Sequence, residues 1–346
     1  MMLDNCYERI IAPENIWRAW MLYRRGKRHR RDVQIFERRL EYNLLQLRRE
    51  LVEGRYKPGG YRTFIVRDPK RRMISAPQIR DQIAHQAIWN IVFPFFNSRF
   101  SRAAHSCRPG FGTHSAIQAI RQIARRLERR GRPHVLHLDV VKFFDSVPHE
   151  VLYNILRTWI ACRKTLRLLG LVINSYDSGR RLPGDPAGRR RGIPLGNLTS
   201  QLFCNAMFME FDWLLAGTAW PGHYVRYADD CFFFGIDKAR LMEIGRKTSG
   251  VLAKLGLSCR TRLRRYYGFE ALGARFFSCG VSVRRNTRQR ALHKLALAAG
   301  DFYDGYLSVS KFESHSRSST GLSFALDRRW TNAVRETIIR ATIVNN

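Results

Sequence analysis

Three aspartates set in apolar surroundings constrain this chain more strongly than any other feature of its sequence. Asp139 follows the apolar run VLHL at 135–138, and Asp229 and Asp230 lie between the runs YVRYA and CFFF. Residues 223–235 have the pattern of two strands joined by a tight turn that carries the acidic pair. Carboxylates clustered in such surroundings repel one another, and their burial is unfavourable unless a cation neutralises them. The sequence therefore predicts a fold that gathers these carboxylates around a cation.

The donor atoms of this predicted site indicate which cation it holds. Oxygen ligands favour Mg²⁺, which keeps waters and takes its remaining ligands from substrate phosphates. Two such ions, roughly 3.5–4 Å apart, would stabilise the attacking and the leaving oxygens of an in-line phosphoryl displacement. Because consecutive strand residues point to opposite faces, we expect Asp229 and Asp139 to be the main ligands, with Val140 beside them and Asp230 in support. The alternative is an ordinary turn-forming aspartate, which is the usual interpretation of an isolated Asp-Asp pair.

The overall charge restricts the class of partner. The 346 residues carry 61 Lys and Arg against 28 Asp and Glu, a formal net charge of +33, and such a chain should bind a polyanion, most plausibly nucleic acid. An apolar fraction of 45% excludes a disordered basic tail and predicts a packed core. Seven scattered cysteines without a CxxC pair favour reduced thiols in a cytoplasmic protein. No apolar run approaches the roughly 20 residues of a membrane span, so we expect no membrane partner.

Apolar periodicity predicts a mixture of helices and short strands. Helices are expected from an N-cap at Asp32 to residue 51, at 79–96, 115–127, 149–160, 240–255 and 289–299, and from about 198 to 215. Strands are expected at 62–66, 73–75, 135–138 and 272–283, besides the acidic hairpin. The pattern is typical of an α+β fold in which a small antiparallel sheet holds the acidic residues.

Several ordered motifs resemble those of a reverse transcriptase over about residues 55–280. They are DPKRR at 68–72, APQIRDQIAHQAI at 76–88, LDVVKFFD at 138–145, RGIPLGNLTSQ at 191–201, YADD at 227–230, LGLSCRTR at 255–262 and GFEALGARFF at 268–277. The resemblance implies a right-hand polymerase with an antiparallel palm sheet and mostly helical fingers and thumb. It implies a basic N-terminal extension at 1–55, fingers and palm at 56–280, and a thumb at 281–346.

The resemblance also implies roles for individual residues. Asp139, Asp229 and Asp230 would be catalytic and hold two Mg²⁺ ions. Phe144, five residues after Asp139, would exclude the 2′-hydroxyl of a ribonucleotide, and the alternative is a packed core aromatic. Further residues implied by the family are Lys70 and Arg72 at the dNTP triphosphate, and Tyr227 with Ala228 at the primer end. Histidines 134 and 137 flank a predicted strand, and we expect them to be packed or capping residues without a catalytic role.

One motif narrows the resemblance to a subfamily. Most reverse transcriptases carry Gln before the Gly of the second palm motif and end it in Ser-Pro, whereas Leu195, Gly196 and Gln201 form LGNLTSQ here. This variant is similar to the diversity-generating retroelement enzymes, and it implies error-prone copying opposite template adenines. Leu195 has no donor or acceptor with which to check a base, and the alternative is that it is only a core residue.

The subfamily resemblance implies further partners. They are a template RNA and its RNA–cDNA duplex, dNTPs and a small basic accessory protein oligomer, in the cytoplasm of a bacterium or as a phage-encoded protein. Arginines outside the motifs suggest a docking surface for a folded RNA. They lie in the stretches 24–31, 125–132, 189–191 and 284–290. The candidates in the basic N-terminal run at 24–31 are Arg24, Arg25, Lys27, Arg28, Arg30 and Arg31. Rival interpretations are a group II intron or retron reverse transcriptase, and a non-catalytic RNA-binding relative of a polymerase.

Overall fold

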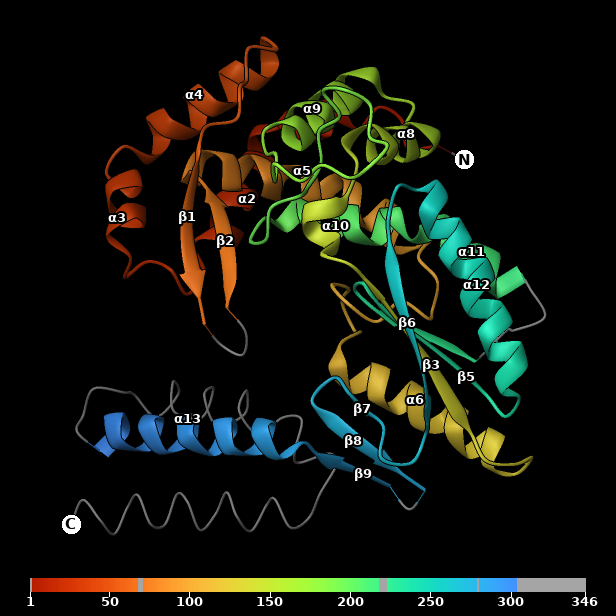
Figure 1. Cartoon of the computed structure of the whole chain (residues 1–346). Coiled ribbons are helices and arrows are strands. Elements are labelled where there is room, and N and C mark those ends of the chain that lie inside the picture. The colour runs from red at the N-terminus through yellow and green to blue at the C-terminus, as the bar shows by residue number, and fades with distance from the viewer. Residues whose placement is uncertain (1, 68–70, 218–222, 279, 304–346) are drawn as a thin grey trace.

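A computed structural model describes residues 2–67, 71–217, 223–278 and 280–303 (Figure 1). Its upper part is helical and carries one two-stranded hairpin. The elements are α1 (Tyr7–Ile11), α2 (Pro13–Tyr23), α3 (Arg31–Glu37), α4 (Leu40–Val52), β1 (Tyr61–Val66), β2 (Arg72–Pro77) and α5 (Ile79–Asn97). The N-terminal helices are part of the core, because Ile16, Ala19 and Trp20 on α2 are buried and α2 packs on α5. The Asn15 side chain binds across this interface, donating to the carbonyl of Ala87 at 3.1 Å.

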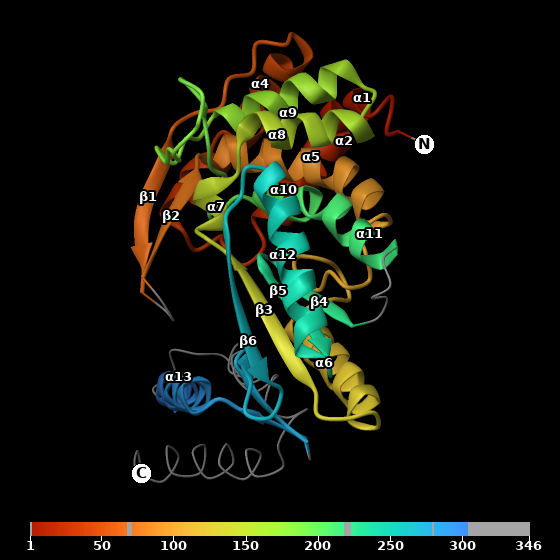
Figure 2. The same cartoon turned by 45° about the vertical axis from the view of Figure 1, so that its right-hand side comes forward.

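The central sheet is antiparallel, with the strand order β4-β5-β3-β6. Its strands are β3 (His134–Val140), β4 (Tyr224–Tyr227), β5 (Asp230–Gly235) and β6 (Cys259–Arg265). Helix α12 (Lys238–Lys254) covers one face, and α6 (Thr113–Glu128) packs against β4 and β5 (Figure 2). The sheet that carries the acidic residues is therefore confirmed, with the mixed α and β character expected of a polymerase palm.

The alternation of side chains on β3 explains why this strand lies in the middle of the sheet. Leu136 and Leu138 enter the core that includes Leu241 and Leu252 of α12, whereas Val135 enters a second core with residues of α6. Both faces of the strand are buried until it reaches Asp139, whose side chain is exposed. The apolar pattern thus determines both the central position of β3 and the end of the strand at which the Asp139 carboxylate is exposed.

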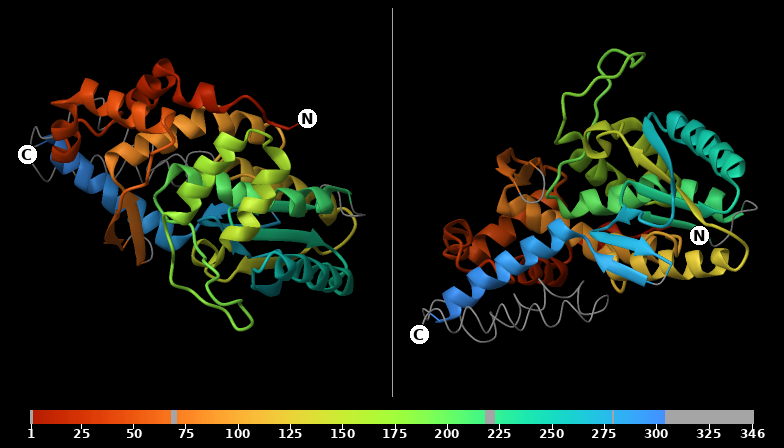
Figure 3. Two further views of the ribbon diagram at one scale, coloured as in Figure 1. Left: turned by 90° about the horizontal axis from the view of Figure 1, so that it is seen from above. Right: turned by 60° about the horizontal axis from the view of Figure 1, so that its bottom comes forward.

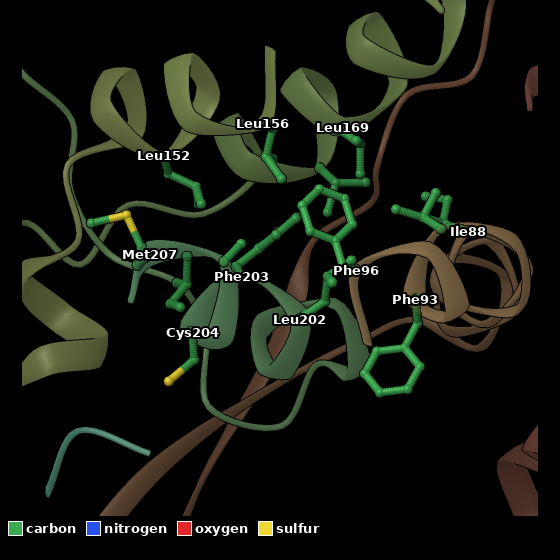
Figure 4. Close-up of a cluster of buried hydrophobic side chains, with 14 of the residues drawn as sticks. Ile88, Phe93, Phe96, Leu152, Leu156, Leu169, Leu202, Phe203, Cys204 and Met207 are labelled. Carbon is green, nitrogen blue, oxygen red and sulfur yellow. The ribbon is translucent and has the colours of Figure 1, made fainter. Parts of the chain in front are cut away.

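A second helical layer surrounds one buried cluster (Figure 4). Side chains of α5, α8, α9 and α10 interdigitate there, among them Phe96, Leu156, Leu169 and Phe203, all nearly inaccessible to solvent. The helices of this layer and its neighbours are α7 (Phe143–Ser146), α8 (His149–Trp159), α9 (Arg163–Asn174), α10 (Leu198–Met207) and α11 (Met209–Gly217).

The last described elements form a small antiparallel sheet and a helix (Figure 3). They are β7 (Glu270–Ala271), β8 (Ala274–Phe277), β9 (Gly280–Val283) and α13 (Arg285–Tyr303). Most of the predicted thumb, from residue 304 onward, lies outside the described residues. Within the described part of the chain, no helix combines the length and apolar character needed to cross a membrane.

Three expectations about helices were wrong. The helix predicted at 32–51 is two helices, because the backbone leaves the helical region at Arg39 (φ −126°, ψ 40°), where the side chain of Asn43 donates to the carbonyl of Phe36. Asp32 lies inside the first turn of α3 and is not its N-cap. The helix expected to run to residue 215 is interrupted at Phe208, which separates α10 from α11.

Candidate active site

The acidic hairpin has a two-residue turn. Strands β4 and β5 pair up to Tyr227 and Asp230, which leaves Ala228 and Asp229 as the connection. Ala228 adopts a left-handed backbone conformation with φ +55°, as hairpin turns of this length require of one or both central residues. Asp229 therefore lies at the tip, whereas Asp230 is the first residue of β5 and not a turn residue as expected.

Asp139 lies directly opposite Asp230 on the neighbouring strand. Opposed residues of an antiparallel pair project from the same face of a sheet, so these two carboxylates share one face. The expectation that Asp229 is the main partner of Asp139 rests on the alternation of consecutive strand residues. The strand alternation does not apply to Asp229, since it belongs to the turn. Val140, the remaining expected ligand, is buried next to Asp139 on β3.

Asp229 titrates far from its ordinary range. Burial, followed by the negative charges of Asp230 and Asp139, raises the pKa of Asp229 to about 6. The charge of Arg72 acts in the opposite direction. Mutual repulsion of this kind identifies a place where a bound cation would be stabilised by all three carboxylates.

The donor set fits Mg²⁺, but a complete coordination shell is not preformed. Three carboxylates supply the oxygen ligands that this ion prefers. Among the described residues, no group of three or more His, Cys, Asp and Glu side chains is arranged to hold a metal ion. The raised pKa of Asp229 is the observation in this structure that supports a cation at this point.

A buried ion pair packs against the turn that carries Asp229. Arg226 of β4 and Asp212 of α11 have no exposed side-chain surface, and their closest atoms, Nη2 and Oδ2, lie 2.6 Å apart. A second contact, from Nε to Oδ1 at 2.9 Å, makes the pair bidentate. Burial opposes the charge of Arg226, but the charge and hydrogen bonds of Asp212 outweigh it and raise the pKa of the guanidinium. Arg226 Nη1 also donates to the carbonyl of Ala228 at 3.0 Å, so the pair fixes the turn itself.

The other side of the turn is held by a polar loop. The amide of Ala228 donates to Ser106 Oγ at 2.8 Å. Asn205 of α10 donates to the Ser106 carbonyl at 3.1 Å and accepts from Arg226 Nη1 at 3.1 Å. Sequence reasoning missed these residues. The one available signal was a charged residue, Arg226, inside an otherwise apolar strand next to the acidic pair.

The expected nucleotide-binding residues of the second palm motif meet Phe144 in one cavity of about 360 Å³. Leu195, Gly196 and Gln201 line it together with Phe144, although Asp139 and Asp229 do not. Gly196 has φ +116°, and a Cβ there would lie 3.0 Å from Cγ2 of Ile74. A side chain at this position would be strained by the positive φ and would press on Ile74 of strand β2.

The residues expected at the triphosphate and the primer are placed less completely. Lys70 lies outside the described residues, and Arg72 opens β2 with an exposed side chain. Tyr227 ends β4, and the hydroxyl of Thr113 donates to its hydroxyl oxygen at 3.2 Å. Tyr227 is thus tied to the start of α6, beside the turn that carries Asp229.

The basic N-terminal run does not behave as one surface. Arg24 lies 3.0 Å and Arg28 3.5 Å from Glu37, and Arg30 lies 2.5 Å from Asp32. Lys27 lies 4.0 Å from the centre of the Tyr23 ring, and both residues line the cavity that contains Phe144 and Leu195. Arg25 and Arg31 are exposed. Lys27, expected to bind RNA together with the rest of the run, therefore lies at the cavity of the expected nucleotide-binding residues instead.

His137 also lies closer to the candidate active-site carboxylates than expected. Its Nε2 lies 2.7 Å from Asp230 Oδ1, and its ring stacks on Phe232 with centroids 4.8 Å apart. The stack agrees with the packing role that the sequence predicts, and the contact to Asp230 is additional to it. The alternation on β3 places it on the same face as Asp139, two residues away, which a sequence argument could have recognised.

An antiparallel sheet that presents clustered carboxylates at one hairpin, between helical layers, defines the palm of a right-hand polymerase. The chain belongs to the reverse transcriptase family: the sequence model of the family described as reverse transcriptase (RNA-dependent DNA polymerase) matches residues 62–262. That match contains Asp139, the second palm motif and the YADD hairpin.

Individual proteins give more distant similarities. Protein YkfC of Escherichia coli is 31% identical over 181 residues, which cover 51% of this chain and 46% of YkfC. Nuclear intron maturase 1, mitochondrial, of Arabidopsis thaliana is 33% identical over 101 residues, covering 29% of this chain and 14% of the maturase. The chain thus spans less than half the length of these curated relatives. A telomerase structure from Candida tropicalis, with a fragment of telomeric RNA, has a TM-score of 0.48 at 13% identity, covering 77% of this chain and 53% of the telomerase chain.

Proposed function

We propose that this protein is an RNA-directed DNA polymerase. The observation that carries the proposal is the meeting of Asp139, Asp229 and Asp230 at one end of the central sheet, within the part of the chain that matches the reverse transcriptase family. In the reaction, a primer 3′-hydroxyl attacks the α-phosphorus of a dNTP and pyrophosphate leaves. The template is RNA.

Different residues of the chain would contribute to metal binding, sugar selection and triphosphate binding in this reaction. Asp139 and Asp230 offer carboxylates from one face of the sheet, and Asp229 offers a third from the turn. Mg²⁺ ions, when bound there, would stabilise the attacking and leaving oxygens. Phe144 lies in the cavity beside the second palm motif, where its ring would leave no room for a 2′-hydroxyl. Arg72 is the candidate contact to the triphosphate, and its positive charge acts on the pKa of Asp229.

We further propose that the polymerase is of the diversity-generating retroelement type and copies template adenines with errors. Leu195 supports this, because an aliphatic side chain lines the nucleotide cavity where most of the family has an amide. Discrimination between bases relies on leaving a wrong partner unpaired, and a leucine has no polar atom to leave unpaired. A structured RNA and a small basic accessory protein belong to the same proposal. The expectation of a cytoplasmic bacterial or phage protein stays a prediction.

A group II intron-type reverse transcriptase is the second candidate. Several relatives are named as intron proteins. They include the Arabidopsis nuclear intron maturase and an uncharacterized 91 kDa protein in a cob intron of Schizosaccharomyces pombe, which is 24% identical over 173 residues, 50% of this chain and 19% of that protein. The error spectrum separates the two candidates. Misincorporation concentrated opposite adenine favours the first, and uniformly accurate copying favours the second.

Primer extension on a short RNA template with Mg²⁺ and dNTPs tests the central proposal. Wild type should extend the primer, Asp229→Ala should not, and the exposed Asp4→Ala should behave as wild type. Extension that survives Asp229→Ala would contradict the assignment. Leu195→Gln should lower misincorporation opposite adenine, and an unchanged error spectrum would remove Leu195 from the explanation.

A further inference from the structure

A second and larger cavity lies away from the catalytic carboxylates. It has a volume of about 700 Å³ and is enclosed by α8, α9 and the loop that follows α9. None of the acidic palm residues lines it. The loop stands out from the body of the molecule in both views of Figure 3. It lies within 177–192, one of the arginine-rich stretches that the polymerase chemistry leaves unexplained.

The lining of this cavity carries more positive than negative charge. Arg167, Arg189 and Arg190 line it, against the single carboxylate of Glu150. No carboxylate of the described residues lies within 4 Å of Arg167, which is exposed on α9. Arg189 makes two long contacts, from Nη1 to Asp185 at 3.4 Å and from Nη2 to Glu150 at 3.8 Å, and its Nε is buried without a hydrogen-bond partner among the described residues. A buried N–H without a partner is unusual in proteins.

The three consecutive arginines of this stretch have different roles. Arg191 is 2% exposed, pairs with Asp185, and donates to the carbonyls of Ser146 and Gly256 at 2.7 and 2.8 Å. It therefore anchors the loop to the palm and is not a surface contact, which corrects its earlier assignment to an RNA-docking surface. Arg189 and Arg190 remain at the cavity, with Arg190 3.6 Å from Asp177.

The walls of the cavity are held in place by specific contacts. His149 Nε2 lies 2.8 Å from the carbonyl of Gly192, and its Nδ1 lies 3.2 Å from Asn174 Oδ1. Gly170 makes room for an aromatic side chain, since a Cβ at that position would lie 3.2 Å from Cε2 of Tyr153. An aromatic ring beside several arginines is the combination with which proteins bind unpaired nucleotides, by stacking a base and neutralising its phosphates.

We propose that this cavity binds a nucleotide of an RNA strand that lies outside the primer–template groove. Its phosphodiesters would contact Arg167, Arg189 and Arg190, and its base would lie against Tyr153. The cations come from two separate elements, Arg167 from α9 and Arg189 and Arg190 from the projecting loop, which suits successive phosphates of a chain more than one free triphosphate. The inference rests on the proposed function, because it takes RNA as the polymerase's own nucleic acid.

The loop also connects this cavity to the polymerase site. Immediately after the anchored Arg191, the amide of Gly192 donates to the carbonyl of Val147 at 2.8 Å, and that of Ile193 donates to the carbonyl of Phe144 at 2.7 Å. RNA bound at the cavity would therefore contact a loop that is hydrogen-bonded through its backbone to Phe144, the residue proposed to select the sugar.

Fluorescence anisotropy with the full-length protein tests the proposal. The primer–template groove is first saturated with a short RNA–DNA duplex, and a labelled 12-nucleotide single-stranded RNA is then titrated at several salt concentrations. Arg167→Gln combined with Arg190→Gln should weaken binding of the labelled RNA by about tenfold and reduce the salt slope by about 1.4, at roughly 0.7 per phosphate contact. Arg157→Gln combined with Arg163→Gln is the matched control, since both residues are exposed on α8 and α9 but do not line the cavity.

The outcomes separate the possible ligands. Equal losses in the cavity variant and the matched control would overturn the proposal. Competition by inorganic phosphate or ATP at micromolar concentration, lost in the cavity variant, would overturn the assignment to RNA in favour of a small-anion site. Photocrosslinking of a 4-thiouridine RNA to a peptide containing Tyr153 is expected, and crosslinks confined to other elements would contradict the site. Primer extension by the same preparations is read separately, because its absence in wild type would remove the polymerase proposal.

Discussion

The buried pair behind the catalytic turn gives a prediction in which stability and activity can be separated. Asp212→Asn removes the charge of Asp212 and leaves Arg226 buried without a counter-ion, although the shape of the side chain is kept. Removing one partner of such a pair lowers the free energy of unfolding by about 3–5 kcal/mol. Both side chains are fully buried and bidentate here, and Tyr224 donates a further hydrogen bond to Asp212 at 3.0 Å. We therefore expect the full loss of about 3–5 kcal/mol in the free energy of unfolding. This loss is a large part of the roughly 5–15 kcal/mol that stabilises a domain.

A double variant separates the two roles of Arg226. Asp212→Leu with Arg226→Met replaces the pair by apolar side chains, which is often neutral or stabilising, so the urea unfolding midpoint should stay near that of wild type. The hydrogen bond from Arg226 to the Ala228 carbonyl is lost, and a contact worth about 0.5–1.5 kcal/mol should reduce the extension rate up to roughly tenfold.

Urea unfolding followed by circular dichroism and single-turnover primer extension are the two measurements. Glu243→Gln, which disrupts the exposed pair with Lys247, is the control and should leave both unchanged. A loss of less than about 1 kcal/mol in Asp212→Asn would refute the energetic reasoning. A double variant that is both stable and fully active would refute the positioning of the turn by Arg226.

Three further predictions concern the active site. Phe144→Ala should raise incorporation of ATP relative to dATP by about tenfold or more in single-nucleotide extension, and an unchanged ratio would leave Phe144 a packing residue. His137→Phe keeps the stack on Phe232 but removes the N–H that binds Asp230. Calorimetry should therefore show weaker Mn²⁺ binding in His137→Phe, and His137→Gln should restore part of the affinity. Equal Mn²⁺ affinity in both variants would contradict a positioning role for His137. Asp229→Asn should raise the melting temperature of the metal-free protein at pH 8. The folded pKa of about 6 exceeds the ordinary value of 3.8, so the ionised carboxylate destabilises the fold above pH 6, and the gain should vanish as the pH falls below about 4; a gain that persists there would show a different cause.

The parts of the structure encoded by short-range patterns were predictable from the sequence. The run VLHLD at 135–139 alternates between two cores and ends in an exposed carboxylate, and the YADD segment forms the expected hairpin. The break at Arg39 was not predictable, because the apolar spacing continues across it from Phe36 to Leu40. Apolar spacing that continues across a break in a helix gives no indication that the break is there.

Long-range contacts explain the remaining omissions. The partner of Arg226 lies on α11, and Ser106 lies in a loop more than 100 residues earlier, so no local spacing connects them. Lys27 reaches the cavity of Phe144 and Leu195 only because α2 packs on α5. The charges in the first 55 residues could be counted from the sequence, but their division among internal pairs, the cavity and the exposed surface depends on the tertiary fold.

The packing of the N-terminal helices has a practical consequence for dissecting the enzyme. The family match begins at residue 62, and a truncated protein starting there would retain every palm motif. It would also lose Trp20, Ile16 and Tyr7, whose apolar surfaces are shared with α5 and α4, and the hydrogen bond from Tyr7 to the Leu51 carbonyl. The newly uncovered face of α5 would favour aggregation. Inactivity of such a fragment would report a damaged scaffold, so the basic segment is better studied by point substitution at Arg25 and Arg31 than by deletion.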